Sequence, residues 1–517
     1  MSDIIVEVGS GKVRGVLDDG IATFKGIPYG APTSGRQRFM PATPPKPWAG
    51  VRDALHWGPS CPQPKGGVLN ISPKVSALFG ESEPLPESEA CLVLNVWAPS
   101  GLRDGSRRPV MVWCHGGGFF VGSGSGGWSD GASLVRGGDV IVVSMNHRLG
   151  PLGYLHLADL AGPAYAASGN AGMLDLVLAL EWVRDNIAAF GGDPGNVTIF
   201  GESGGGAKVS MLLAMPAARG LFHRAIIQSG PGLTMRPADE ATRDADRLLR
   251  QLGIDAQNLR ALHEMPAERL IEAQSRLHRF NPYYVLTPVV DGEILPRSPF
   301  EPTAPETARD VPLLIGTTKD ETTLFLGKIP LLGTFSRETF ISRPLLALVT
   351  RALIGRAAPR VLRAHREAKP GAPASELLAG ITSDLTMRIG SIRIAERQSA
   401  TATAPVFMYL LAWESPALDG KLGATHSLDV PLVFDNVASA PGLTGNLPEA
   451  HALARRMSRA WIAFARSGDP EHPELPDWPA YTPDDRATMI FDNECRVDHD
   501  PGREQRLAME GVRLWAM

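Results

Sequence analysis

The chain has 517 residues, of which 44% are apolar and 21% charged, so it is neither a disordered segment nor a small domain short of a core. Its 51 basic and 55 acidic residues nearly cancel, and this balance favours neither nucleic acid nor an acidic membrane surface as a partner. No uncharged apolar run approaches the roughly 18 residues of a membrane span. The sequence also lacks a basic start followed by an apolar segment, so we expect a cytoplasmic protein without a membrane span.

The first 100 residues contain short apolar runs such as KVRGVLDDGIATFKGIPYG, which predict short antiparallel strands. Beyond them, β-branched runs alternate with helical patterns, and this alternation predicts a mostly parallel sheet connected by helices. The clearest helical pattern is Gly172–Ala189, where apolar residues recur at helical spacing. The expected strands are Pro109–Cys114, Val140–Ser144, Val197–Phe200, Ala225–Ile227 and Val311–Ile315.

The stretch from about Pro237 to Lys369 is mainly helical and interrupted by prolines, so we expect an insertion that covers one end of the sheet. Near the C-terminus, HALARRMSRAWIAFARS predicts an amphipathic helix that ends at Gly468. We therefore expect one α/β domain over residues 1–517, with antiparallel strands in 1–100 and a helical, cap-like insertion in about 237–369.

The most specific local motif is Gly201-Glu202-Ser203-Gly204-Gly205. A G-x-S-x-G pattern alone is weak, but here a β-branched run enters it and the helix-forming run AKVSMLLAM leaves it. A strand–turn–helix setting of this kind is typical of a nucleophile elbow, in which glycines tolerate a strained turn that exposes the serine. The alternative is a glycine-rich helix start with an ordinary capping serine. We favour Ser203 as a nucleophile.

Upstream, His115-Gly116-Gly117-Gly118 directly follows an expected strand. Consecutive glycines allow backbone N–H groups to point into a cavity, which suits a developing oxyanion. Slightly further on, Gly122–Gly127 matches G-x-G-x-x-G, but no helix opens there and no acidic residue follows at the spacing of a dinucleotide site. C-x-x-C and H-E-x-x-H spacings are also absent from the sequence. We therefore expect neither a cofactor nor a metal.

A serine nucleophile requires a base, and the base requires a carboxylate that fixes its tautomer. Of the twelve histidines, His426 lies in a loop well after the apolar run PVFMYLLAW, where a base at the end of a late strand is expected. The acid follows the strand-like VPLLIG, and either Asp320 or Glu321 could fill that position. The order serine, acid, histidine is that of the α/β-hydrolase fold.

Many separate motifs of this chain, in the right order, resemble the type-B carboxylesterase family, the α/β-hydrolase group that includes the cholinesterases. They include Gly169–Asp175, Phe190–Pro194 and Val197–Gly205, and the similarity runs from FKGIPYG near the start to DWPAY near the end. The resemblance implies an α/β-hydrolase fold with a central, mostly parallel sheet, a small N-terminal antiparallel sheet and a helical insertion over the active site.

In this family the acid is a glutamate, so the resemblance resolves the choice between the two acids in favour of Glu321. It also implies Ser203 as the nucleophile and His426 as the base. The implied oxyanion donors are the N–H groups of Gly117, Gly118 and Gly204. Glu202 and Ser229 match positions that support the triad from outside it.

The chain departs from the family pattern at a few positions, among them Gly204, where the family usually has alanine. Cys61 and Cys91 match cysteines that secreted relatives pair as a disulfide. Because we expect a cytoplasmic protein, we expect both thiols to be reduced. The segment between them contains no tryptophan or tyrosine, and Phe79 is its only aromatic residue, so we expect no cholinesterase-like cation site.

Together these observations predict a serine carboxylesterase that hydrolyses uncharged esters through an acyl-enzyme, with a small-molecule ester as its partner. The same triad could act mainly on carbamates, amides or lactones, because one triad serves all of these bonds. The least favoured hypothesis is a non-catalytic binding module, since the cell-adhesion members of the resembled family lose the nucleophile that Ser203 supplies here.

Overall fold

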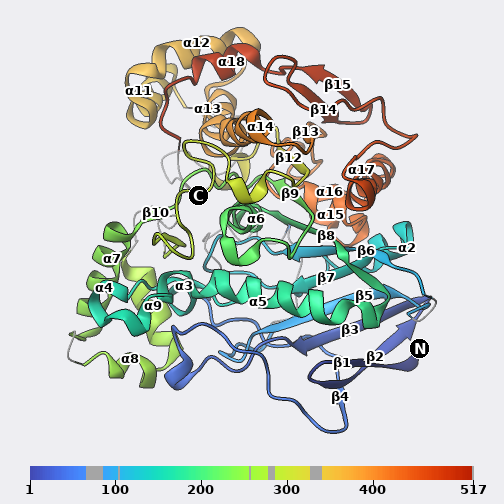
Figure 1. Cartoon of the computed structure of the whole chain (residues 1–517). Coiled ribbons are helices and arrows are strands. Elements are labelled where there is room, and N and C mark those ends of the chain that lie inside the picture. Colours follow the sequence, from blue (N-terminus) through green and yellow to red (C-terminus); the bar gives the residue numbers. More distant parts are fainter. Residues whose placement is uncertain are drawn as a thin grey trace.

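The computed structural model describes residues 1–65, 78, 85–102, 105–255, 258–277, 286–326 and 341–514. Its framework is a 13-stranded sheet in the order β1-β2-β3-β5-β7-β6-β8-β9-β12-β13-β14-β15, with β4 paired to β2. Figure 1 shows this sheet running through the molecule, with helices on both faces. The strands are β1 Ser2–Val8, β2 Gly11–Asp18, β3 Ile21–Pro28, β4 Val51–Asp53, β5 Val93–Pro99, β6 Arg108–Cys114, β7 Ile141–Met145, β8 Gly192–Glu202, β9 Arg224–Gln228, β12 Leu313–Thr318, β13 Val406–Leu411, β14 Ala487–Phe491 and β15 Arg496–His499. Outside this sheet, the short strands β10 Arg236–Pro237 and β11 Val289–Val290 pair with each other.

The N-terminal strands are antiparallel, as predicted: β1 pairs with β2, β2 with β3 and β3 with β5. They do not form a separate small sheet, however, because β5 pairs directly with β7 of the central sheet. From β7 to β14 the neighbouring pairs are all parallel. The predicted parallel core is therefore confirmed, and the antiparallel part extends it at one edge.

The central strands lie where the apolar runs predict them. All five residues of β7, and the last five of β6, are buried, as expected of strands covered by helices on both faces. The longer helices of the chain include α2 Ala132–Gly138, α5 Ala171–Asn186, α6 Gly204–Ala214, α7 Ala238–Leu252, α9 Ala267–Leu277, α11 Arg343–Ile354, α12 Ala358–Ala368, α13 Ala374–Ser383, α14 Ile389–Thr401 and α17 Pro448–Ser467. The shorter ones include α3 Gly150–Tyr154, α4 Ala158–Ala161, α8 Arg260–Glu264, α10 Thr323–Leu326, α15 Asp429–Val433, α16 Pro441–Thr444 and α18 Arg503–Ala508.

The helices expected between 237 and 369 form two groups. Helices α7, α8 and α9 precede β12, whereas α11 and α12 follow it, and Figure 1 shows the two groups at different ends of the molecule. The central strand β12 separates them, so the expected insertion is interrupted by part of the sheet itself. None of the helices among the described residues is both long enough and apolar enough to cross a bilayer.

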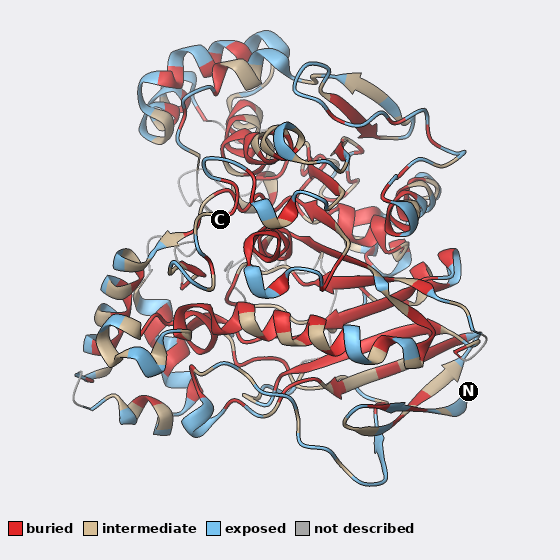
Figure 2. Cartoon of the chain, in the orientation of Figure 1, coloured by how far each residue is buried: buried red, intermediate tan, exposed pale blue. Residues whose placement is uncertain are grey.

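Helix α6 lies at the centre of the molecule, and every one of its residues is buried (Figure 2). It follows β8 directly, while β12 and β13 run parallel to β8 in the same sheet. The carboxyl ends of parallel strands meet at one edge of the sheet, where ligands of such folds bind. The fold therefore brings the segments that follow β8, β12 and β13 together at that edge.

Candidate active site

Ser203 occupies the turn between β8 and α6, with φ 58° and ψ −124°. A residue with a side chain is strained at positive φ, and such strain is common where a side chain must be presented for chemistry. The turn is held because Ser203 N donates to Gln228 O on β9 at 2.8 Å, and Ala207 N donates to Ser203 O at 3.0 Å. The predicted elbow at Ser203 is therefore present in the structure.

Two glycines beside Ser203 are required by close backbone packing. A Cβ atom at Gly205 would lie 2.0 Å from Cys114 O, and one at Gly204 would lie 2.4 Å from Gly118 Cα. Both distances are far inside van der Waals contact, so a side chain at either position would push the strand or the loop away. The glycine at 204, where the family usually has alanine, thus coincides with a close approach of the loop at Gly118.

The loop Gly116–Gly118 carries the predicted oxyanion donors. Gly117 and Gly118 have positive φ values of 85° and 63°, which a glycine adopts without strain. Within the described part of the chain, the N–H groups of Gly117, Gly118 and Gly204 donate to no other residue. Free N–H groups at the start of a helix and in an adjacent loop can stabilise negative charge on a reacting oxygen.

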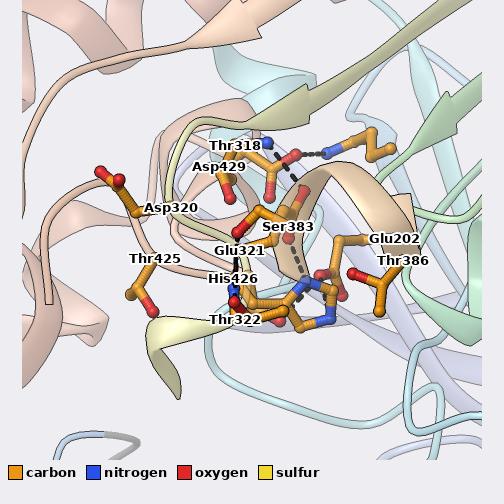
Figure 3. Close-up of polar contacts among 12 residues, drawn as sticks. Glu202, Thr318, Asp320, Glu321, Thr322, Ser383, Thr386, Thr425, His426 and Asp429 are labelled. Carbon is orange, nitrogen blue, oxygen red and sulfur yellow. Dashed lines mark hydrogen bonds and ion pairs between the residues drawn. The ribbon is translucent and has the colours of Figure 1, made fainter. Parts of the chain in front are cut away.

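Glu321 and His426 are in direct contact, although they are far apart in the sequence. His426 Nδ1 donates to Glu321 Oε2 at 2.5 Å, and Glu321 Oε1 accepts a bond of 2.9 Å from the N–H of Thr318 at the end of β12. Both side chains are buried, and Figure 3 shows them beside Glu202. A carboxylate on Nδ1 places the free electron pair of the neutral imidazole on Nε2.

The Nε2 side of His426 faces Glu202. Glu202 Oε1 lies 3.2 Å from His426 Nε2 and accepts a bond of 2.8 Å from Ser427 Oγ. Burial alone would lower the pKa of His426, but the charges of Glu202 and Glu321 raise it to about 9. Burial also raises the pKa of Glu202 to about 7, against the opposing charge of His426. The charge of each group thus favours the ionised form of the other, while burial opposes both charges.

Within the described residues, no hydrogen bond joins Ser203 Oγ to His426. The two side chains nevertheless belong to segments at the same edge of the sheet, because β8 leads into Ser203 and β13 precedes the His426 loop. Hydrogen bonds of catalytic groups are often formed only when substrate is bound. The structure thus shows the histidine paired to its acid and to Glu202, with the serine on the adjacent turn.

Asp320, the other candidate acid, bonds the backbone of the loop that carries His426. Its carboxylate accepts a bond of 3.0 Å from Ala424 N, and its own N–H donates to Ala424 O at 2.9 Å. In Figure 3 the Asp320 side chain points away from His426. Asp320 therefore holds the backbone of the His426 loop, whereas Glu321 contacts the imidazole.

Hydroxyl groups of the two residues after Glu321 fix the acid loop to its neighbours. Thr323 Oγ1 donates to Leu422 O at 2.7 Å and lies 2.9 Å from Thr425 Oγ1, so it links the acid loop to the histidine loop. Thr322 Oγ1 donates to Ala379 O of α13 at 3.0 Å, and the Thr322 N–H donates to Ser383 Oγ at 3.1 Å. Sequence patterns do not single out these threonines, because only their partners, distant in sequence, reveal their role.

A buried polar network that sequence patterns also leave hidden lies beneath the site. Asp429 Oδ2 accepts bonds of 2.9 Å from both Gln228 Nε2 and Tyr409 Oη, and Trp461 Nε1 donates to Gln228 Oε1 at 3.1 Å. Gln228 also provides the carbonyl that holds Ser203 N. Asp429 lies three residues after His426, but its partner Gln228 is 201 positions away, so no local pattern marks the pair.

Ser229 is fully buried, and its N–H donates to Gly316 O at 2.9 Å. Its hydroxyl has no hydrogen-bond partner among the described residues. The structure therefore places Ser229 beside the strand ends, and its supporting role in catalysis stays a prediction.

All four cysteines, Cys61, Cys91, Cys114 and Cys495, are free thiols. Burial raises the pKa of Cys61 well above its ordinary value, so this thiol stays protonated. Among the described residues, no group of three or more histidine, cysteine or acidic side chains is arranged to hold a metal ion.

A parallel sheet with a strained serine between a strand and a helix, and with a histidine–glutamate pair beyond later strands, defines an α/β-hydrolase. Comparison with known proteins shows to which family within this fold the chain belongs. Residues 2–509 match the family described as the Carboxylesterase family, and the chain belongs to that family.

Two bacterial relatives are similar over almost their whole length. The chain is 39% identical to para-nitrobenzyl esterase of Bacillus subtilis, with 98% of each chain covered. It is 35% identical to phenmedipham hydrolase of Pseudarthrobacter oxydans, again with 98% of each covered. Full-length similarity of this kind confirms the family predicted from the motifs.

Solved structures agree with the fold. A structure of PNB esterase has a TM-score of 0.84 and 37% identity, covering 98% of this chain and 99% of that one. The Geobacillus stearothermophilus carboxylesterase EST55 has a TM-score of 0.83 and 39% identity, with the same coverage. The protein is thus an α/β-hydrolase of the carboxylesterase type, an enzyme that hydrolyses carboxylic esters.

Proposed function

We propose that Ser203, His426 and Glu321 form the catalytic triad of this esterase. The observation that carries the proposal is the bond between His426 Nδ1 and Glu321 Oε2, at the sheet edge where the elbow presents Ser203. In this arrangement His426 Nε2 takes the proton of Ser203 as its oxygen attacks the acyl carbon. Glu321 holds the imidazole in the required tautomer and stabilises its positive charge.

The reaction then proceeds in two halves. The tetrahedral intermediate places its negative oxygen among the N–H groups of Gly117, Gly118 and Gly204, which make no other bond within the described chain. His426 returns the proton to the leaving alcohol, and an acyl-enzyme remains on Ser203. Water, activated by the same histidine, releases the acid and regenerates the serine. Glu202 steadies the imidazole from the Nε2 side.

Replacing Ser203 by Ala is the direct test of this triad. In subtilisin, whose triad works in the same way, removing the nucleophile costs about 10⁶ in kcat. We expect the same order here, measured with a chromogenic ester on the purified variant, with a circular dichroism spectrum that matches the wild type. A folded Ser203→Ala protein with more than a few per cent of wild-type activity would show that another group is the nucleophile.

We further propose that the substrates are uncharged esters with compact or medium acyl groups. Cation–π recognition of a quaternary ammonium is worth about 2 kcal/mol or more when the site is desolvated. The segment between Cys61 and Cys91 has no tryptophan or tyrosine to provide it, and its single aromatic residue, Phe79, lies outside the described residues. The alternative of carbamates has weak support from the phenmedipham hydrolase among the relatives.

A comparison of kcat/KM for a choline ester and a neutral ester of the same acyl group tests this substrate class. We expect the neutral ester to be at least as good a substrate. A preference of tenfold or more for the choline ester, about 1.4 kcal/mol, would show that a cation site exists. Amides, carbamates and lactones in the same panel decide between the ester and the alternatives.

We also propose that the chain works as a single domain in the cytoplasm. The free, buried thiols of Cys61 and Cys91 support a reducing compartment, because such thiols persist there. Alkylation of freshly lysed cells followed by mass spectrometry should find both thiols reduced, and a disulfide between them would contradict the proposed compartment.

A further inference from the structure

Helix α6 contains a charged residue that the proposed mechanism does not use. All eleven residues of this helix are buried, and ten of them are glycine, apolar or serine. The remaining one is Lys208, whose side chain is fully buried on the helix that starts at Ser203. A lysine in such a position is unusual, because lysine is almost never fully buried without a partner.

The ammonium group of Lys208 contacts the oxyanion loop. Lys208 Nζ donates to His115 O at 2.8 Å, and it lies 5.6 Å from the ring centre of Phe119. His115 and Phe119 flank the three glycines of the loop. One side chain of the nucleophile helix therefore touches the residues on both sides of Gly116–Gly118.

A buried lysine at this position lowers the stability of the fold, and the need to fill space does not explain why it is there. No carboxylate within the described residues forms an ion pair with Lys208, and burial lowers its pKa to about 7. A buried charge without a counter-ion destabilises a fold, whereas a methionine of similar length would fill the same space without that cost. The position is therefore better explained by what the donor does than by the volume that it fills.

Two histidines close to Lys208 carry no positive charge of their own. His115 and His147 stack with ring centres 4.8 Å apart, and burial, followed by the charge of Lys208, lowers the pKa of both well below the ordinary value. Both imidazoles are consequently neutral. His115 Nδ1 donates to Gly116 O at 2.8 Å, so the first peptide groups of the loop are fixed from two sides.

We propose that Lys208 is a positioning residue of the oxyanion hole. Its bond to His115 O fixes the distance between the Gly116–Gly118 loop and the first turn of α6. The inference rests on the proposed function of that loop. The packing leaves little slack, since a Cβ on Gly204 would lie only 2.5 Å from Gly118 N. A shift of the loop would therefore move the N–H groups of Gly117 and Gly118 away from that of Gly204, and oxyanion stabilisation depends steeply on such distances.

Lys208→Met removes the donor while keeping most of the volume. Because the oxyanion forms only during reaction, we expect kcat to fall about 10- to 100-fold while KM stays within about threefold. A trifluoromethyl ketone, which forms a tetrahedral oxyanion adduct with the serine, should lose affinity by the same factor as kcat. Equal losses in kcat and in adduct affinity are not expected from a merely weakened fold.

Val209→Ala is the matched control, because it also creates a defect in the buried face of α6 but leaves the Lys208 bond intact. It should lower the melting temperature with kcat and adduct affinity within about threefold of the wild type. If Lys208→Met does not fold, Lys208→Leu, which also removes the donor and is apolar, is tested by the same criterion of parallel losses.

Two results overturn the inference. The first is a folded Lys208 variant whose kcat and ketone affinity stay within threefold of the wild type, and the second is a loss of kcat that Val209→Ala reproduces at equal melting temperature. Ser203→Ala, measured alongside, separates this outcome from failure of the triad: if Ser203→Ala remains active, the nucleophile is wrong, whatever Lys208 does.

Discussion

The turn that carries Ser203 and the loop that carries His426 are held by different kinds of contact. Around Ser203 the chain packs backbone against backbone, so that a Cβ on Gly205 would come within 2.0 Å of Cys114 O. Around His426, side chains hold the loop: Asp320 bonds Ala424 and Thr323 Oγ1 bonds Leu422 O. The first arrangement depends on the absence of side chains and the second on particular polar groups, so the two should respond differently to mutation.

After Ser203→Ala, the largest expected effect is on the acid that contacts the imidazole. Glu321→Gln should lower kcat by about 10⁴, because an amide favours the wrong histidine tautomer, as in serine proteases. Asp320→Asn should lower kcat far less, since the Asp320 carboxylate contacts Ala424 N and Lys319 Nζ instead of the imidazole. Steady-state kinetics on both folded variants decide the matter, and a larger loss for Asp320→Asn would reverse the assignment of the two acids.

In the turn that carries Ser203, a substitution that adds a side chain should lower the free energy of unfolding, whereas the catalytic groups themselves stay unchanged. Gly205→Ala forces a methyl group against Cys114 O, and overpacking of this kind costs about 3 kcal/mol in the free energy of unfolding. Gly137→Ala is the matched control, because Gly137 lies exposed in α2 with open space around its Cα. It should change stability by less than about 1 kcal/mol, in the stabilising direction. Urea unfolding of both variants compares them, and equal stabilities would contradict the packing argument.

The pH dependence of kcat/KM tests the contacts of His426 with Glu202 and Glu321. Burial would lower the pKa of His426, but Glu202 and Glu321 raise it to about 9, and the base must be neutral to act. Activity should therefore rise with pH well above about 6.5, the ordinary value for histidine. Glu202→Gln removes one of the two charges, so the acid limb of kcat/KM should move down by about one pH unit. Asp320→Asn should leave that limb in place, and an unmoved limb in Glu202→Gln would show that Glu202 does not control the imidazole.

The same contrast explains what the sequence can predict. The Ser203 turn is predictable because its constraints are local: a β-branched strand, three glycines and a helix follow one another in the chain. The strands are predictable as well, since β6 and β7 are continuous apolar runs. His426 is found from its place after a late strand, but the choice of Glu321 over Asp320 needs the family resemblance, because both are acids at the same strand end.

What the sequence does not predict consists of contacts between segments distant in the chain. Thr323 acts through Leu422 O, Asp429 through Gln228, and Lys208 through His115 O, and no local pattern marks any of these pairs. The helical character of 237–369 suggests one insertion, although an apolar run predicts a strand inside it. That run is β12, and its pairing with β9 and β13 makes it part of the sheet.

The pairing of β12 with β13 also has a consequence that we expect during folding. The contacts that hold the Ser203 turn come from β6, β8, β9 and α6, all before residue 229, whereas the Glu321–His426 contact joins residues 105 positions apart in the later part of the chain. Contacts that close long loops form late, because chain entropy opposes them until neighbouring structure is in place. We therefore expect catalytic activity to appear during refolding only after the strands that follow α6 have joined those that precede it. Recovery of activity would then report the assembly of the C-terminal half of the sheet.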